Sequence, residues 1–214
     1  MSRSRTSATI RERGQGGRHA ADSRLEQVTA AALSVFGRYG YQRTSMDLIA
    51  KAAGISRPAL YQHFRGKDDI FRAAGERIAD ELISAAETAA TADAPTAGRL
   101  YRAPAVKLDF AAGSLDPRFR GDLIAEASAR LPSLQASMKA RHAAVIEKIL
   151  SSAADLDLAA TAIPARDIAV VLLDALTGIA QQDEPAHELR RRLRHLVNLT
   201  AGGLGSRAQP KEVP

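Results

Sequence analysis

The sequence contains no cysteine. This absence excludes disulfides, thiolate metal sites and cysteine nucleophiles, and it agrees with a reducing compartment. The longest apolar run, Ile168–Leu173, is too short to span a bilayer. The first twenty residues have no apolar stretch that could serve as a secretory signal. We therefore expect a soluble, cytoplasmic protein with no membrane partner.

Strand patterns are missing as well. No segment alternates apolar and polar residues as a half-buried strand does, and no internal repeat is visible. From Asp22 onward the apolar residues recur at helical spacing. The pattern predicts an all-α protein, and 214 residues are enough for one or two domains with a buried core.

The positive charge is unevenly distributed. Residues 1–72 contain 13 Lys and Arg against 6 Asp and Glu, whereas residues 73–214 contain 17 against 18. A basic end on a nearly neutral body indicates a polyanionic partner for that end. The alternative is a solubilising tail, because several arginines lie in the polar, Gly-rich residues 1–21. These residues lack apolar periodicity, which predicts disorder.

Proline, glycine and capping residues divide the rest of the chain into helices. A loose tail begins at Gly205. The predicted helices span about 23–38, 44–54, 56–64, 67–90, 97–112, 117–130, 133–153, 165–181 and 187–203.

The second and third predicted helices are short and are separated only by Gly54-Ile55. Two helices joined by a brief turn that contains Gly form a helix-turn-helix. The second helix of this motif can enter the major groove of DNA while the first crosses the phosphate backbone. Many helical hairpins contain glycine, so the geometry alone is only moderately specific.

The residues from Tyr41 to Asp68 are more specific. They contain an aromatic residue followed by x-x-Thr-Ser, then Ile-Ala-x-x-Ala-Gly-Ile-Ser, Leu-Tyr-x-His-Phe, and a Lys followed by an acid. In order and spacing this stretch resembles the N-terminal domain of the TetR family of transcriptional regulators. One departure is Pro58, where the family often has Gly. The resemblance covers roughly residues 22–72.

The resemblance implies a bacterial regulator with a three-helix DNA-binding domain at residues 22–72. A helical domain at residues 73–204 would dimerise and bind a small-molecule effector, which releases the operator. The expected partners are double-stranded operator DNA, a second copy of the chain, and a small hydrophobic or amphipathic effector, with no cofactor. We expect a repressor rather than an activator. The alternatives are an architectural DNA-binding protein without an effector, or a helical enzyme.

Several residues of the motif are candidates for DNA contact. A helix N-terminus near Thr44 and Ser45 can hold a phosphate, and Lys67 is a further phosphate candidate. Arg57 and Gln62 have the donors to read guanine or adenine edges. Leu60 and Phe64 are expected in the core, and His63 is as well suited to packing as to DNA contact. The full predicted set is Thr44, Ser45, Ser56, Arg57, Ala59, Tyr61, Gln62, His63 and Lys67.

An effector cavity would be enclosed by the fourth to eighth helices. Large or adaptable side chains with a few polar groups suit such a cavity. Ordinary core packing is the alternative for each of them. The predicted lining residues are Tyr101, Phe110, Phe119, Met138 and His142.

The last two helices are predicted to dimerise as a four-helix bundle about a two-fold axis. The first of them is apolar on two sides, which leaves one side for a partner. A charge at Leu176 or Leu193 should then give monomers. The predicted interface comprises Ile168, Val171, Leu172, Ala175, Leu176, Ile179, Leu189, Leu193, Leu196 and Val197.

Other chemistry finds little support. None of three histidines has a metal-binding partner at the next helical turn: His142, His187 and His195. Three acids could form a buried set, but acids on helix surfaces are usually solvated: Asp109, Glu126 and Asp174. The basic run Arg190–Arg192 is more typical of the wet face of an amphipathic helix than of a nucleic-acid patch. No catalytic spacing is visible, so we expect no enzyme.

Overall fold

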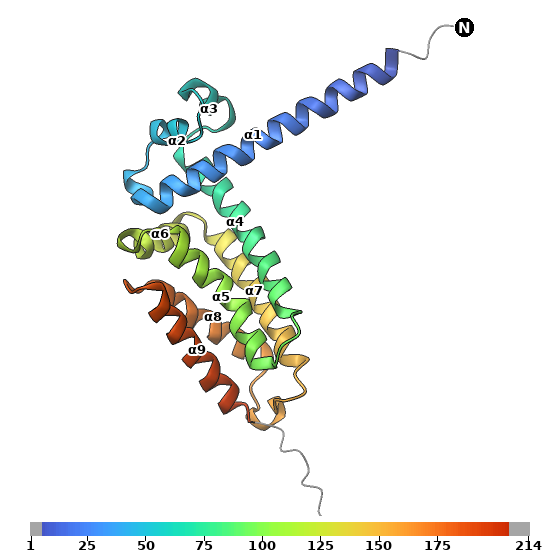
Figure 1. The fold of residues 1–214 in the computed structure, drawn as a ribbon, viewed down its shortest axis with the longest axis vertical. Helices are drawn as coiled ribbons and strands as arrows, with labels where there is room; N and C mark the ends of the chain where they lie inside the picture. The colour runs from blue at the N-terminus through green and yellow to red at the C-terminus, as the bar shows by residue number, and fades with distance from the viewer. Residues whose placement is uncertain (1–5, 206–214) are drawn as a thin grey trace, which may run out of the picture.

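The computed structural model describes the backbone of residues 6–205 and the side chains of residues 24–159 and 161–205. Within this part of the chain the regular elements are all helices, which confirms the all-α prediction (Figure 1). They are α1 (Thr6–Arg43), α2 (Met46–Ala52), α3 (Arg57–His63), α4 (Lys67–Ala90), α5 (Thr96–Ser114), α6 (Pro117–Arg130), α7 (Pro132–Ser151), the short 3₁₀ helix η1 (Leu158–Thr161), α8 (Ala165–Ala180) and α9 (Ala186–Gly203).

The helices form a small head and a longer body. In Figure 1, α2 and α3 sit at one end of the molecule beside the C-terminal half of α1. Helix α4 leaves the head, packs on α1, and then runs alongside α5 and α7. Helices α8 and α9 pack on α7 and α5 respectively, and α6 lies against α1. The head therefore rests on the body through α1, α4 and α6.

The boundaries follow the capping chemistry of the sequence. Pro117 and Pro132 occupy the first position of α6 and α7, where a missing N–H leaves no hydrogen bond unmade. Pro164 and Pro185 directly precede α8 and α9. Pro104 lies inside α5, and the helix continues through it with the Pro104 side chain buried.

The beginning of α1 differs from the prediction. We expected disorder over residues 1–21 and a helix from about residue 23, but the backbone is helical from Thr6. Extending an existing helix avoids the cost of nucleation, so a segment without an apolar face can continue one. Residues 1–5 and the predicted tail from residue 206 lie outside the described residues. At its other end, α1 is broken at Gly40, whose φ is 73°.

One hydrophobic core extends from the head into the body. Its aromatic centre consists of Phe36, Tyr41 and Phe71, whose ring centroids lie 5.0–5.9 Å apart. Leu60 and Phe64 are buried in this core, as predicted. The core is therefore continuous across residue 72. The predicted division into a DNA-binding domain at residues 22–72 and an effector domain at residues 73–204 remains a proposal about function.

The apolar stripes of α8 and α9 face the chain's own core. Six of the ten residues predicted at the dimer interface are buried within the single chain, which corrects their assignment: Ile168, Leu172, Leu176, Leu189, Leu193 and Val197. Helical periodicity locates an apolar stripe but does not say which neighbour covers it. By contrast, Val171 is 65% exposed and Leu199 is 76% exposed.

None of the helices in the described part of the chain combines the length and apolar character that crossing a membrane requires.

Candidate DNA-binding face and effector cavity

Two serines start the short helices of the head. The Ser45 hydroxyl accepts a hydrogen bond from the Leu48 N–H at 3.2 Å and caps α2. The Ser56 hydroxyl accepts from the Ala59 N–H at 3.3 Å and caps α3. Each cap satisfies a backbone donor that the first turn would otherwise leave unpaired. Helices of this length need such caps, because isolated short helices are marginal in water.

The turn between α2 and α3 depends on Gly54. Its φ is 67°, in the left-handed region that residues with a Cβ rarely adopt. The next residue, Ile55, donates its N–H to the Ala50 carbonyl at 3.0 Å, which closes the end of α2. The predicted helix-turn-helix is therefore present, and Gly54 allows the tight turn between its two helices.

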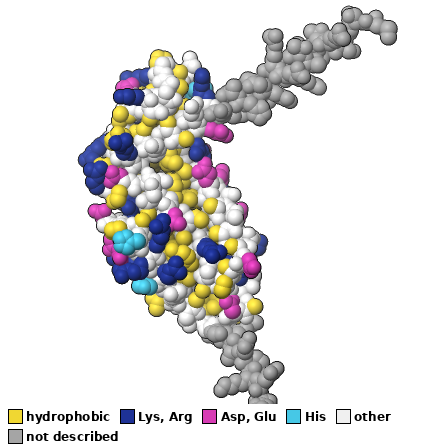
Figure 2. Space-filling view, in the orientation of Figure 1, with side chains coloured by type: hydrophobic (Ala, Val, Ile, Leu, Met, Phe, Trp, Pro, Cys, Tyr) yellow, Lys and Arg dark blue, Asp and Glu magenta, His cyan; other side chains and the backbone are white. Residues whose placement is uncertain are grey.

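The outer side of the head presents polar side chains. Arg57 lies 3.2 Å from Asp47 and 5.6 Å from the centre of the Tyr61 ring, with all three side chains exposed. An exposed ion pair of this kind contributes little, so the guanidinium remains available to another partner. Ser45, Ser56, Gln62 and His63 are also exposed, and Ala59 is half-buried. Figure 2 shows Lys and Arg side chains over the head and along one flank of the body.

Thr44 and Lys67 are placed differently from the rest of the predicted set. Thr44 is 3% exposed, and its hydroxyl donates to the Gly40 carbonyl at 2.7 Å. The Lys67 ammonium donates to the Tyr41 carbonyl at 2.9 Å and lies 4.1 Å from the centre of that ring. Both side chains therefore support the turn after α1. Thr44 does not belong to the exposed face, because the turn folds its hydroxyl inward.

A polar network joins the head to the body. The Tyr41 hydroxyl donates to Asp68, and the Arg130 guanidinium covers the Tyr41 ring at 4.1 Å. Arg130 also pairs with Asp68 at 3.1 Å and with Glu126 at 2.6 Å, while Gln42 donates to Glu126. Burial and the Asp68 hydrogen bond raise the pKa of Tyr41 to about 12, so the phenol stays protonated. The ends of α1 and α6 are thus fastened to the start of α4.

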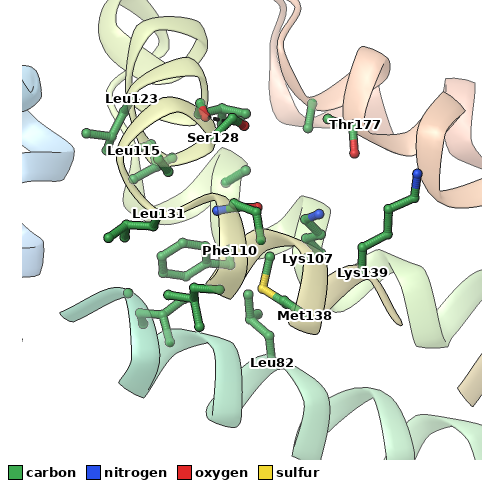
Figure 3. Close-up of a pocket in the computed structure, with 18 of the residues that line it drawn as sticks. Leu82, Lys107, Phe110, Leu115, Leu123, Ser128, Leu131, Met138, Lys139 and Thr177 are labelled. Carbon is green, nitrogen blue, oxygen red and sulfur yellow. Dashed lines mark hydrogen bonds between the residues drawn. The ribbon is translucent and has the colours of Figure 1, made fainter. Parts of the chain in front are cut away.

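A cavity of about 350 Å³ lies directly beneath the head, with walls from α1, α4, α5, α6, α7 and α8. Most of its lining is apolar, and Figure 3 shows Phe110 and Met138 facing the space from α5 and α7. Phe36 and Phe71, from the aromatic centre of the head, also line it. This is a suitable volume for a small molecule held mainly by apolar contact.

Three of the five predicted cavity residues line it, namely Phe110, Met138 and His142. The other two predicted residues do not line this cavity. Tyr101 packs under the Arg194 guanidinium at 4.3 Å, and Phe119 lies beside Gly40 at the junction of α1 and α6. A large side chain is suited to a cavity, but only helix packing decides whether it points into one.

His142 has one partner in the protein. Its Nε2 lies 3.1 Å from the Ala103 carbonyl, so Nε2 carries the proton and donates it. Burial lowers the pKa of His142, which keeps the ring neutral. The buried Nδ1 has no hydrogen-bond partner among the described residues. A ligand with an O–H or N–H group could donate to this nitrogen.

Comparisons with known proteins agree with the geometry of the head. The family described as bacterial regulatory proteins, tetR family, matches residues 28–74, which include the whole helix-turn-helix. Residues 28–74 are therefore a DNA-binding domain of the TetR type.

One similar protein is the HTH-type transcriptional activator FasR of Mycolicibacterium smegmatis. It is 38% identical over 96 residues, which cover 45% of this chain and 44% of FasR. The chain spans less than half the length of the curated relatives it matches. These relatives are named as HTH-type transcriptional regulators.

Solved structures extend the likeness of fold to the body. A TetR-family transcriptional regulator from Streptomyces coelicolor superposes with a TM-score of 0.65 at 24% identity, covering 84% of this chain and 80% of that one. The regulator FadR from Bacillus subtilis, solved with stearoyl-CoA, gives 0.63 at 17% identity, covering 84% and 99%. At these identities the likeness establishes the fold of the body and nothing further.

The remaining polar candidates are paired with one another. Each acid of the considered set has its own cation: Asp109 with Arg190, Glu126 with Arg130 and Asp174 with Lys139. Arg191 and Arg192 pair with Glu188 and Glu184, as expected for a solvated helix face. Among the described residues, no group of three His, Asp or Glu side chains could hold a metal.

Proposed function

We propose that the chain is a dimeric TetR-type repressor that binds operator DNA with its head and releases it when a small molecule fills the cavity. The observation that supports this most is the double role of Phe36 and Phe71. Both rings belong to the aromatic centre of the head and to the lining of the cavity. A molecule in the cavity would therefore contact the residues that orient α1 and α4 under the helix-turn-helix.

The proposed DNA contacts follow from exposure. Arg57 and Gln62 lie on the exposed side of α3 and would read base edges, whereas Tyr61 and His63 would contact the sugar-phosphate backbone. The N-termini of α2 and α3 would face phosphates beside Ser45 and Ser56. Lys67 would contribute positive charge while it holds the turn. Thr44 has no part in the proposed contacts.

The proposed signal path runs through the polar network of Tyr41, Asp68 and Arg130. Leu131, the residue after Arg130, lines the cavity. A ligand that displaces Leu131 or Phe71 would shift the end of α6 against the start of α4. Such a ligand needs only a higher affinity for the arrangement that does not fit DNA, and typical coupling is about 1–3 kcal/mol.

The proposed dimer uses the outer faces of α8 and α9. Val171 and Leu199 are the most exposed large apolar residues in the body, and Ala175, Ile179 and Leu196 remain partly accessible. Four of these five, all except Leu199, belong to the originally predicted interface. Pairing these faces about a two-fold axis would give a four-helix bundle and present two heads to one operator.

The effector is proposed to be small and hydrophobic or amphipathic. The cavity is mainly apolar, with a few polar groups among its lining residues. FadR from Bacillus subtilis, which shares the fold, was solved with stearoyl-CoA. That molecule combines an apolar chain with a charged group, so the fold is compatible with ligands of this type.

The test begins with selection of duplexes from a random DNA pool by the full-length chain. The affinity for a selected duplex should fall steeply with salt, with a log–log slope of about −0.9 per neutralised phosphate. A thermal-shift screen then identifies cavity ligands, and each ligand is added to the DNA complex. In vitro transcription from a promoter that overlaps the duplex should be blocked by the chain and restored by a stabilising ligand.

Four results would contradict parts of the proposal. Salt-independent DNA binding would remove the operator role. A monomer at micromolar concentration in light scattering would remove the dimer. Ligands that stabilise the chain without changing its affinity for DNA would leave an architectural protein, and increased transcription on DNA binding would indicate an activator.

A further inference from the structure

One cation of the cavity lacks an ionic partner. Lys107 on α5 lines the cavity and is half-buried, and it forms no ion pair or hydrogen bond with another described residue. Its neighbour Lys139 on α7 is paired with Asp174 on α8 at 2.6 Å. Figure 3 shows the Lys107 amine on the cavity side, between Phe110 and Lys139. Burial and the charge of Lys139 lower the pKa of Lys107.

The charged lining residues of the cavity do not balance. They are Lys107, Lys139 and Asp174, whose formal charges leave one positive charge in excess. The other polar groups around the space are neutral, and most of the surface is apolar. A cation removed from water without a counter-charge is unfavourable. The position of Lys107 is therefore suited to a ligand that supplies one negative charge.

We propose that the cavity binds a single-chain amphiphile whose one carboxylate pairs with Lys107 and whose apolar chain lies against Phe110 and Met138. This inference rests on the proposed function, because it names the chemical class of the effector for the same cavity. A carboxylate neutralises the excess charge, whereas a dianionic phosphate monoester would leave a negative excess. A neutral amphiphile would leave Lys107 unpaired.

The test uses calorimetric titration of the full-length chain with three probes of equal chain length, below the concentrations at which they form micelles. Dodecanoate should bind more tightly than dodecyl phosphate and more tightly than dodecan-1-ol. Lys107→Met removes the charge but keeps an unbranched side chain, and it should weaken dodecanoate by roughly tenfold or more, since charge-assisted hydrogen bonds are the strong ones. Its affinity for dodecan-1-ol should stay the same or rise.

Two further variants make the result specific. Lys148→Met changes an exposed lysine on α7 outside the cavity and should leave all three affinities unchanged. Lys107→Arg keeps the charge and should retain most of the preference for dodecanoate over dodecan-1-ol. Thermal unfolding of each variant shows whether it is folded. The ratio of its affinities for dodecanoate and dodecan-1-ol can be compared between any variants that fold. The proposal would be overturned if Lys107→Met left the ratio of the dodecanoate and dodecan-1-ol affinities unchanged, or if the parent chain did not bind dodecanoate.

Release of DNA is measured separately, so the two proposals can fail independently. If dodecanoate binds in a manner that depends on Lys107 but never releases DNA, the ligand class stands and the regulatory function fails. If other ligands release DNA while dodecanoate and dodecan-1-ol bind equally well, the function stands and the carboxylate site is refuted.

Discussion

The outer face of the head and the cavity beneath it are built in different ways. The face lies within residues 45–63, and its two helices are started by Ser45 and Ser56 through contacts three residues apart. The cavity draws residues from Leu33 to Ala180 and needs six helices to enclose it. Short-range chemistry thus determines the face, whereas long-range packing determines the cavity. Substitutions that affect only the local chemistry of the face, or only the long-range packing of the body, test this comparison.

The largest effect is expected for a charge in the core of the body. Leu176 on α8 is fully buried, so Leu176→Asp should lose about 4 kcal/mol or more of unfolding free energy, because it leaves a cavity and an unpaired charge. Val171 on the same helix is exposed, so Val171→Asp should leave the chain folded and shift it to monomers. Denaturant unfolding and light scattering measure the two outcomes. A folded monomeric Leu176→Asp would restore the interface predicted from the sequence.

The contact of the head with the body should be nearly as sensitive. A Cβ at Gly37 would lie 2.3 Å from the Ser114 carbonyl oxygen, so Gly37→Ala must push α1 away from the end of α5. We expect a loss of about 1–3 kcal/mol in denaturant unfolding. Gly113→Ala is the matched control, because nothing lies within 4 Å of its Cβ position in α5. Equal stability of the two variants would show that the approach of α1 to α5 is not tight.

The DNA-binding face should respond without loss of fold. Arg57→Ala and Gln62→Ala should each weaken binding to a selected duplex by about 1–3 kcal/mol and relax its sequence preference. Both side chains are exposed, so thermal stability should change little. Arg102→Ala, an exposed arginine on α5, serves as the control with unchanged binding. Uniform weakening on all sequences would assign Arg57 and Gln62 to phosphate contact instead of base contact.

The polar network of Tyr41, Asp68 and Arg130 joins the head to the body. Its loss should weaken the coupling between ligand binding and DNA binding more than it weakens either binding event. Arg130→Met removes the contacts of the guanidinium with Tyr41, Asp68 and Glu126. A compound that releases DNA from the parent chain should still bind this variant, but its effect on DNA affinity should shrink by about 1 kcal/mol. Titrations of DNA with and without the compound measure the difference. Full coupling in the variant would exclude Arg130 from the signal path.

The smallest effect is expected for the pH dependence of stability. Burial lowers the pKa of His142 in the folded chain below the ordinary value near 6.5, so the unfolded chain takes up a proton first as the pH falls. The stability contribution of the neutral ring is complete above the ordinary pKa and declines below it, towards the folded pKa. His142→Gln should flatten this decline between pH 7 and pH 5 in thermal unfolding, whereas the exposed His187→Gln should not. An identical slope in both variants would contradict the burial argument.

Much of the head could be read from the sequence because its determinants are local. The N-caps Ser45 and Ser56, the glycine turn at Gly54 and the core positions Leu60 and Phe64 all depend on neighbours within a few residues. Thr44 was the exception, since its hydroxyl turns inward to Gly40. In the body, prolines marked most helix boundaries for the same local reason, and the all-α class followed from the apolar period.

Only the tertiary structure decided which apolar side chains lie in the core, line the cavity or stay exposed. Leu176 and Val171 share one helix, yet packing against α7 buries the first and leaves the second exposed. Phe110 enters the cavity while Tyr101, on the same α5, packs under Arg194. Lys107 became a candidate ligand-binding residue only when its place beside the pair of Lys139 and Asp174 was known. A sequence specifies periodicity and capping through near neighbours, whereas burial and charge balance depend on helices that meet across the whole chain.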